Sequence, residues 1–225
     1  MTLTQVFPDQ RPVQDLDELF TVPSRPWLRI NLISSIDGSV GGADGTSASL
    51  TRGSDRAVLG AIRRASDVVL VGASTVRTEG YLLPKSVPLA IVTASGDLSG
   101  AALPRQLDDG RVIVLCPAAL AGSVHLPGAR VVGVGGSSML SSAAILSTLH
   151  GFGLESIVCE GGPTLAGRLV GDGIVDELCL STSPVIGGRL SPLFGDLAGE
   201  PRGMTLGRLL VDETGVSYSR WRATG

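Results

Sequence analysis

Short apolar runs alternate with amphipathic stretches along most of the chain, which is the pattern of strands and helices in turn. The runs are rich in Val, Ile and Leu, as expected of strands that are covered on both faces of a sheet. They occupy Trp27–Ile36, Asp67–Val71, Leu89–Thr93, Arg111–Cys116, Arg130–Val134, Ser156–Cys159 and Glu177–Ser181. Helical spacing predicts helices over residues 54–65, about 139–150 and about 162–170.

The end of the chain has a different pattern. Two apolar segments, Gly207–Val211 and Val216–Trp221, are joined by the turn signal Asp212–Gly215 and predict an antiparallel pair. Strand–helix units in series, finished by a hairpin, predict an α/β fold: a mostly parallel central sheet with helices on both faces and an antiparallel C-terminal hairpin. Residues 1–25 read as an N-terminal arm that packs on the body or on a partner subunit, and residues 26–225 as one domain.

The composition narrows the class of protein. The net charge is −3, from 18 basic and 21 acidic residues without a long block of either, so the clustered basic face of a nucleic-acid binder is not expected. No apolar run approaches the ~18 residues of a membrane span, and the first residues lack the features of a signal peptide. We therefore expect a cytoplasmic protein that binds neither nucleic acid nor membrane. The three cysteines lie far apart in apolar stretches, which predicts buried, reduced thiols and no metal site.

Candidate binding residues follow the strands, because ligands of open α/β sheets bind at the carboxyl ends of the strands. Glu160–Thr164 directly follows one strand and opens a helix. Its two glycines let the backbone approach a ligand, and the N–H groups of a helix start favour a phosphate; a plain structural turn is the alternative. Gly72 ends another strand, and the hydroxyls of Ser74 and Thr75 either cap the next helix or bind a pyrophosphate or a nicotinamide amide.

Two further segments carry carboxylates at the same expected edge of the sheet. Ser34–Gly38 ends the first strand with hydroxyls and Asp37, and is either a ligand site or an ordinary Asp-Gly turn. Glu79 follows the Gly72–Thr75 segment and is a candidate substrate anchor or proton relay, with a solvated loop residue as the alternative.

With these residues in view, the chain resembles the reductase domain of riboflavin biosynthesis from about Trp27 to Gly188. The markers are short, but they occur in the same order and at the same spacing as in that family. They are Ser35-Ile36-Asp37-Gly38, Thr51, Ile62–Asp67, Val71–Val76, Glu160-Gly161-Gly162, Val175–Leu178 and Ile186-Gly187-Gly188.

The resemblance implies a dihydrofolate-reductase-like fold, NADPH as cofactor, a homodimer, and reduction of 5-amino-6-(5-phosphoribosylamino)uracil, which opens the ribose to a ribityl chain. By resemblance, the nicotinamide half of the cofactor contacts Gly72 and Thr75, the pyrophosphate lies on the glycine pair, and the 2′-phosphate reaches Thr93 and Ser95. The full cofactor side comprises Gly72, Thr75, Thr93, Ser95, Glu160, Gly161, Gly162 and Thr164. The substrate side comprises Asn31, Ser35, Thr51, Arg63 and Gly188, with Glu79 and Asp37 as candidate proton donors.

Several positions depart from the family pattern. Family members commonly carry a lysine at the position of Asn31 and a tryptophan at that of Ser49, and their Asp-Asp-Pro reads Glu79-Gly80-Tyr81 here. Loss of the lysine removes a cation that anchors an anionic substrate. The chain has no His-x-Glu and no Pro-Cys-x-x-Cys, which excludes zinc-dependent deamination. Two alternatives stay open: a reductase of a pteridine or dihydrofolate-like heterocycle, and an NADPH-binding protein that has lost catalysis.

Overall fold

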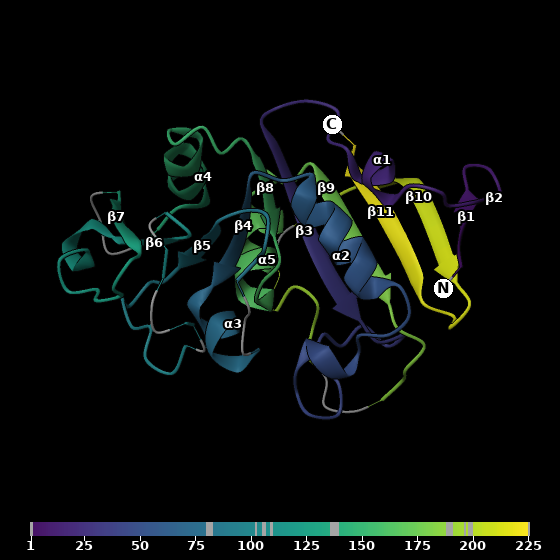
Figure 1. Ribbon diagram of the computed structural model, residues 1–225, viewed down its shortest axis with the longest axis horizontal. Coiled ribbons are helices and arrows are strands. Elements are labelled where there is room, and N and C mark those ends of the chain that lie inside the picture. Colours follow the sequence, from purple (N-terminus) through teal and green to yellow (C-terminus); the bar gives the residue numbers. More distant parts are fainter. Residues whose placement is uncertain are drawn as a thin grey trace.

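A computed structural model describes residues 2–79, 83–101, 103–104, 107–108, 110–135, 140–187, 191–195, 197 and 200–224. These residues build one sheet of eleven strands in the order β2-β1-β10-β11-β9-β3-β8-β4-β5-β6-β7 (Figure 1). The strands are β1 (Leu3–Phe7), β2 (Arg11–Pro12), β3 (Trp27–Ser34), β4 (Val68–Gly72), β5 (Leu89–Val92), β6 (Val112–Pro117), β7 (Arg130–Val134), β8 (Ser156–Cys159), β9 (Glu177–Thr182), β10 (Met204–Asp212) and β11 (Ser217–Ala223). The helices are α1 (Leu16–Phe20), α2 (Asp55–Arg64), α3 (Ala73–Thr78), α4 (Ser142–His150) and α5 (Pro163–Gly171), with 3-10 turns η1 (Ser47–Ser49) and η2 (Ala118–Leu120).

The sheet has a parallel and an antiparallel part. All neighbours from β9 through β3, β8, β4, β5 and β6 to β7 are parallel. From β9 outward, β11, β10, β1 and β2 pair antiparallel. The predicted mostly parallel sheet with an antiparallel C-terminal hairpin is confirmed. The hairpin is longer than the pattern predicted, because β10 begins at Met204 and continues through an irregularity between Leu206 and Arg208.

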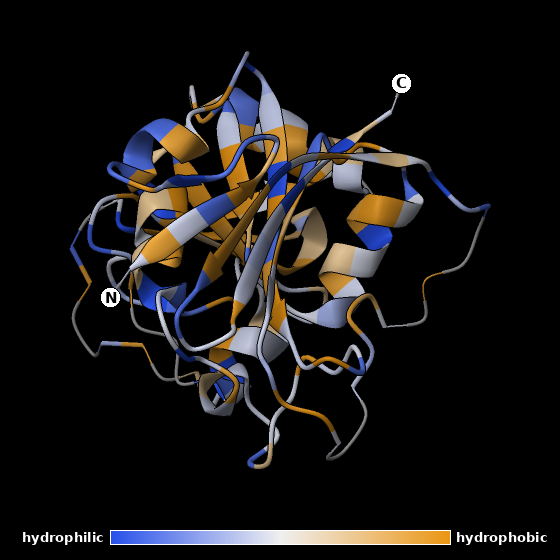
Figure 2. Cartoon of the chain, turned by 90° about the vertical axis from the view of Figure 1, so that its right-hand side faces the viewer, coloured by the Kyte–Doolittle hydropathy of each residue, from blue (hydrophilic) through white to orange (hydrophobic). Residues whose placement is uncertain are grey.

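Helices cover both faces of the sheet, as predicted. One core lies under α1, α2 and α3 and includes Phe20, Ile62 and Val76. The other lies under α4 and α5 and includes Ile145 and Leu169. Figure 1 shows α2 in front of β3 and β9 with α5 behind the sheet, and Figure 2 shows the hydrophobic residues concentrated between these layers. The parallel strands therefore present their carboxyl ends along one edge, at the bottom of Figure 1, where α3 and η1 lie.

Residues 1–25 pack on the body of the molecule. β1 extends the sheet by pairing with β10, and α1 forms from the amphipathic patch at residues 16–20 and packs on α2. A buried ion-pair triad holds the end of α1: Arg29 and Arg220 both bind Glu177, and they also donate to the backbone oxygens of Phe20 and Leu19. The sequence pattern did not reveal β1, since only two of its five residues are buried and its edge neighbour β2 has only two residues.

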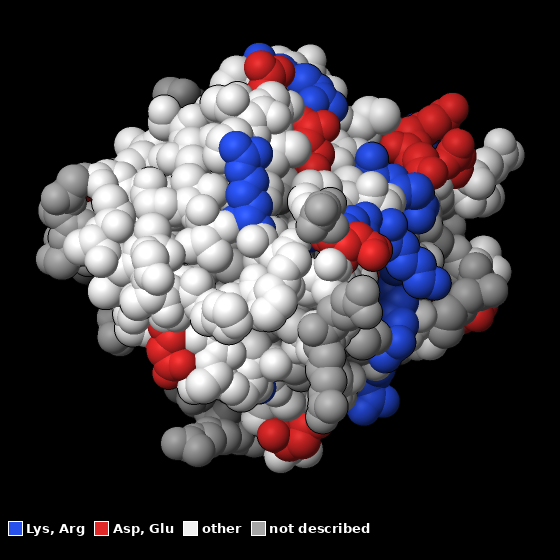
Figure 3. Space-filling model, turned by 60° about the vertical axis from the view of Figure 1, so that its left-hand side comes forward, with Lys and Arg blue, Asp and Glu red and all other residues white. Residues whose placement is uncertain are grey.

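The burial of the cysteines and the distribution of charged side chains on the surface are those expected of a compact α/β protein. Cys116, Cys159 and Cys179 are buried and free, and burial raises the pKa of Cys159 to about 12. In the part of the chain that the structure describes, no helix combines the length and apolar character needed to cross a membrane. On the face drawn in Figure 3, large areas are uncharged and most basic side chains lie in a narrow band next to acidic ones.

Candidate functional site

The carboxyl ends of β4 and β8 lie side by side, and the predicted cofactor residues follow them. β4 lies beside β8, and the backbone N–H of Glu160 donates to the oxygen of Leu70 at 3.0 Å. This pairing brings the Gly161–Gly162 segment against Thr75 of α3. A Cβ on Gly161 would lie 2.9 Å from Thr75 Cγ2, and one on Gly162 would lie 2.9 Å from Thr75 Oγ1. Both positions therefore require glycine. At Gly162 there is a second reason, because its φ of +73° is a left-handed conformation that favours glycine.

The start of α5 offers donors to an anion. Gly162 is the N-cap and supplies no side chain to cap the helix, and Pro163 has no N–H. The remaining N–H groups of the first turn have no partner within the helix, and Thr164 is exposed there. Bare backbone, unpaired N–H groups and the helix dipole together suit a phosphate group. The glycine pair and the helix start thus fit the pyrophosphate of a dinucleotide.

Thr93 and Ser95 lie at the end of the next strand, since Val92 of β5 is in register with Gly72 of β4. The Thr93 hydroxyl is buried and accepts the N–H of Gly96 at 3.1 Å, whereas Ser95 is exposed. Both therefore stand in one turn at the same edge as the glycine pair, two strands further out, because β4 lies between β8 and β5. Their assignment to the 2′-phosphate stays a prediction.

A buried ion pair joins the predicted cofactor and substrate sides. Arg63 of α2 binds Glu160 through Nε–Oε1 at 2.7 Å and Nη2–Oε2 at 2.6 Å. The Glu160 side chain is 5% exposed, so this bidentate pair is largely shielded from solvent. Glu160 is thus attached to α2, while the next two residues form the glycine segment. Sequence reasoning assigned Arg63 and Glu160 separately to ligands, and the structure shows that they bind each other.

Polar and apolar side chains of β3 and β9 lie under α2. Asn31 of β3 lines a cavity of about 10 Å³ together with Val58 and Ser181, which is room for about one water molecule. Asp55, in the first turn of α2, is half-buried next to the hydroxyls of Thr51 and Ser181. Burial raises the pKa of Asp55, and hydrogen bonds with these two hydroxyls offset only part of that effect.

Asp55 is the residue that sequence reasoning missed. The pattern placed it on the polar side of the helix, and its position four residues after Thr51 was the one available signal. Its surroundings come from β9, which is more than 120 residues away in the chain.

The two predicted proton donors each hold a loop. Asp37 accepts the hydroxyl of Ser35 at 2.6 Å and the N–H of Gly187 at 3.3 Å, and the Ser35 bond chiefly keeps the pKa of Asp37 below its usual value. Glu79 accepts the N–H of Ser47 at 3.1 Å and its hydroxyl at 2.7 Å, which ties α3 to η1. Asp37 is therefore suited to staying ionised rather than to giving up a proton. Gly188, the remaining predicted substrate residue, lies outside the described residues.

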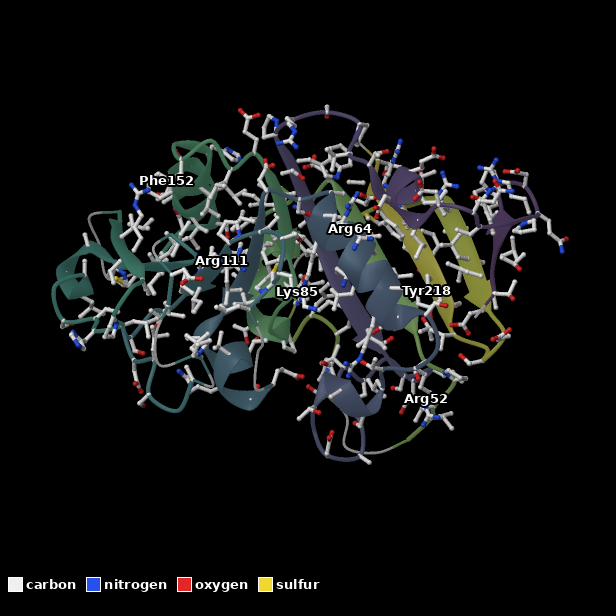
Figure 4. All side chains as sticks on the ribbon, in the orientation of Figure 1. Arg52, Arg64, Lys85, Arg111, Phe152 and Tyr218 are labelled. Carbon is white, nitrogen blue, oxygen red and sulfur yellow. The ribbon has the colours of Figure 1, made fainter. Side chains whose placement is uncertain are left out.

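The C-terminal hairpin positions the start of α2. Asp212 Oδ2 accepts the backbone N–H of Ser54 at 2.8 Å and the hydroxyl of Tyr218 at 2.7 Å. A Cβ on Gly53, whose φ is +55°, would lie 2.0 Å from the same oxygen. Figure 4 labels Tyr218 of β11 beside α2, at a height between Arg52, which precedes the helix, and Arg64 at its end. The hairpin thus fixes where Thr51 and Asp55 stand.

Known proteins share this architecture. The family model described as the RibD C-terminal domain matches residues 26–216. The chain belongs to this family. The resemblance to the reductase domain of riboflavin biosynthesis is thereby confirmed.

Two relatives carry the same name, 2,5-diamino-6-ribosylamino-4(3H)-pyrimidinone 5′-phosphate reductase. The relative from Methanothermobacter thermautotrophicus is 29% identical over 184 residues, covering 73% of this chain and 81% of its own. The relative from Archaeoglobus fulgidus is 27% identical over 196 residues, covering 76% of this chain and 87% of its own.

Solved structures show the same fold at low identity. A pyrimidine reductase-like protein from Corynebacterium diphtheriae has a TM-score of 0.72 at 24% identity, covering 94% of this chain and all of that one. A deaminase/5-amino-6-(5-phosphoribosylamino)uracil reductase from Thermotoga maritima has a TM-score of 0.72 at 21% identity, covering 89% of this chain and 57% of that one. A dihydrofolate reductase from Enterococcus faecalis has a TM-score of 0.50 at 13% identity, covering 89% and 98%. The expected dihydrofolate-reductase-like fold is confirmed.

Proposed function

We propose that this chain is an NADPH-dependent reductase of a 6-ribosylaminopyrimidine 5′-phosphate in riboflavin biosynthesis. The observation that carries the proposal is the contact of Gly161 and Gly162 with Thr75, which leaves bare backbone at the start of α5 beside the Arg63–Glu160 pair. The family match and the shared name of the two relatives support the same reaction. The substrate is a small molecule, and the reaction is an oxidoreduction.

The cofactor is a reduced nicotinamide dinucleotide, whose C4 supplies a hydride to C1′ of the opened sugar. Gly161, Gly162 and the first turn of α5 hold its pyrophosphate. Thr93 and Ser95, two strands further out after β5, receive the 2′-phosphate that distinguishes NADPH from NADH. Thr75 lies against both glycines, so it orients the nicotinamide half relative to the phosphates.

The substrate lies on the α2 side of this segment, among Asn31, Thr51 and the loops that carry Asp37 and Glu79. Because Asn31 provides no charge, the cations for the substrate phosphate are Arg52, just before α2, and Arg56, in its first turn, both of which are exposed. Protonation of the sugar imine nitrogen makes C1′ a better hydride acceptor. Of the two carboxylates, Glu79 is the stronger candidate for this proton, since hydrogen bonding lowers the pKa of Asp37.

The direct test follows NADPH absorbance with 2,5-diamino-6-ribosylamino-4(3H)-pyrimidinone 5′-phosphate and with 5-amino-6-(5-phosphoribosylamino)uracil. Dihydrofolate serves as the competing substrate and NADH as the competing cofactor. Turnover of a pyrimidine with NADPH supports the proposal. Turnover of dihydrofolate alone would identify the chain as a reductase of a pteridine-like heterocycle instead. Tight NADPH binding without turnover of any of the three would identify a binding protein that has lost catalysis.

The protein is proposed to be a homodimer. Leu206, Leu209, Val211 and Trp221 lie on the face of the hairpin opposite to α1 and α2, they are half-buried, and they belong to neither core. A second copy that packs on this face would cover them. Light scattering of the wild type and of Leu209→Glu tests this: a dimer that becomes a monomer supports the proposal, and a wild-type monomer contradicts it.

A further inference from the structure

Arg220 of β11 has a buried nitrogen without a hydrogen-bond partner. Its Nε binds Glu177, and its Nη1 donates to the backbone oxygen of Leu19. Its Nη2 touches Glu177 as well, but it is buried and makes no hydrogen bond with any residue that the structure describes. Because Arg29 binds the same carboxylate, two guanidinium groups share one negative charge. An unpaired N–H beside an excess positive charge is costly to bury, so a further partner for Nη2 is expected.

A small cavity lies next to this guanidinium group. Its volume is about 10 Å³, which is room for about one water molecule. One row across three neighbouring strands consists of Asn31, Cys179 and Arg220, because Asn31 pairs with Cys179 and Cys179 pairs with Arg220. All three residues line the cavity. The cavity therefore connects Arg220 at one end of the row with Asn31 at the other.

The polar groups that line this cavity differ in whether they are already used. Tyr218 and Ser219 donate their hydroxyl protons to other acceptors. Among the described residues around the cavity, the groups left to bind a water are Nη2 of Arg220, the side-chain amide of Asn31 and the hydroxyl oxygen of Ser181, which can still accept.

The chemistry of these three groups determines the direction of each hydrogen bond. A guanidinium group can only donate, so the oxygen of a water in the cavity faces Arg220. The two water protons then need acceptors, which the amide oxygen of Asn31 and the hydroxyl oxygen of Ser181 provide. Three hydrogen bonds are typical of a buried water. With its oxygen bound in this way, the amide of Asn31 directs its NH2 group away from the cavity.

The other side of Asn31 belongs to the proposed site. Ile30 pairs with Cys159 at the end of β8, so the residues that follow them, Asn31 and Glu160, stand at the same level of the sheet. Glu160 is followed directly by the glycine pair proposed to hold the cofactor. Arg220 lies on the opposite side of Asn31, two strands away. Asn31 thus stands between the buried guanidinium group and the proposed cofactor segment.

We propose that Arg220 is a positioning residue: through one buried water it holds the oxygen of Asn31, so that Asn31 presents its NH2 group to an acceptor oxygen of the substrate. This inference rests on the proposed reductase function and defines the polarity of one contact with the substrate. The oxygen and the NH2 group of an asparagine have nearly the same shape, so without the water either orientation fits the space. Arg220 therefore selects the orientation that donates.

The exchange Arg220→Met removes the donor to the water and leaves Arg29 and Glu177 as a neutral pair. The KM for the pyrimidine phosphate that the wild type reduces is expected to rise about three- to tenfold, the effect of one hydrogen bond, while kcat stays within about twofold. In an Asn31→Ala background no amide remains to be oriented, so Arg220→Met should leave KM unchanged there. Arg220→Lys keeps a charged donor and should recover part of the wild-type KM.

The matched control is Arg29→Met. It removes the other arginine of the same triad and also leaves a neutral pair, but Arg29 is not among the residues that line the cavity. We expect it to lower the stability in urea unfolding as Arg220→Met does, without a rise in KM. An equal rise of KM in the two variants, or the same effect of Arg220→Met in the Asn31→Ala background, would reduce Arg220 to a structural role and overturn the inference.

A neutron crystal structure of the wild type keeps the inference testable should the variants not fold, because it locates the amide protons. We expect a water within hydrogen-bond distance of Arg220 Nη2, with the amide oxygen of Asn31 facing it. A cavity without water, or an amide whose NH2 group faces the water, would overturn the inference while leaving the reductase proposal intact. If the wild type reduces neither pyrimidine phosphate, the reductase proposal fails, and with it the role of Asn31 toward the substrate.

Discussion

Replacement of Gly162 by alanine tests the contact on which the cofactor site depends. Gly162 has a φ of +73°, and an added Cβ would lie 2.9 Å from Thr75 Oγ1. Thr75 is buried and β-branched, so its side chain cannot turn away easily. The left-handed backbone costs about 1–2 kcal/mol for a non-glycine residue, and the forced contact adds about 1–3 kcal/mol. We expect Gly162→Ala to lower the free energy of unfolding by about 2–5 kcal/mol, as the sum of these two terms.

Gly153→Ala is the matched control. Gly153 follows α4, has a φ of +76°, and has open space where its Cβ would stand. It therefore shares the backbone cost of about 1–2 kcal/mol without the contact. Urea unfolding of both variants separates the two contributions, and fluorescence titration gives the Kd for NADPH.

The same substitution also tests where the phosphates of the cofactor bind. If the pyrophosphate lies on the backbone of Gly161 and Gly162, Gly162→Ala raises the Kd for NADPH by about tenfold or more, which corresponds to about 1.4 kcal/mol. Gly153→Ala leaves it unchanged. Equal Kd values for the two variants, with both folded, would refute the placement of the phosphates at the start of α5.

Four further outcomes are expected. Tyr218→Phe removes a hydrogen bond to the buried Asp212 carboxylate and should cost about 2 kcal/mol in urea unfolding; a loss below 0.5 kcal/mol, on the order of an ordinary surface change, would contradict it. Burial by itself would raise the pKa of Asp212, but hydrogen bonds from Thr214, Tyr218 and Ser54 lower it. Its stabilisation is therefore present above the unfolded pKa of about 4 and is lost as the pH falls through the lower folded value; in an acid titration, Asp212→Asn should flatten this loss. Glu79→Ala should reduce kcat about a hundredfold while NADPH still binds, and unchanged turnover would leave Glu79 as a loop residue. Cys159 and Cys179, both with a pKa raised to about 12 by burial, should resist a thiol reagent at pH 8 until the protein unfolds; rapid labelling of the folded protein would show that they are accessible.

The sequence pattern predicted most of the fold because the central strands are almost wholly apolar. β4, β6 and β8 are buried along nearly their whole length, so their composition alone marks them. The glycine pair after β8 was equally visible, since glycine at a strand–helix junction has a direct steric reason. β1 and β2 were not visible, because an edge strand with few buried positions has no periodicity that distinguishes it from a loop.

The site was predictable only in part, and the reason is the distance along the chain between its members. The local sequence determined that Gly161 and Gly162 stand between a buried strand and a helix, and that Asp37 occupies a tight turn. Only the tertiary structure decided that Arg63 binds Glu160, 97 positions away, and that Asp212 holds Ser54, 158 positions away. Local pattern records backbone preference and burial, whereas the partner of a polar side chain depends on which distant strands and helices the packing of two cores brings side by side. That is why Asp55 looked like a surface residue of a helix in the sequence and stands, in the folded protein, half-buried between Thr51 and Ser181.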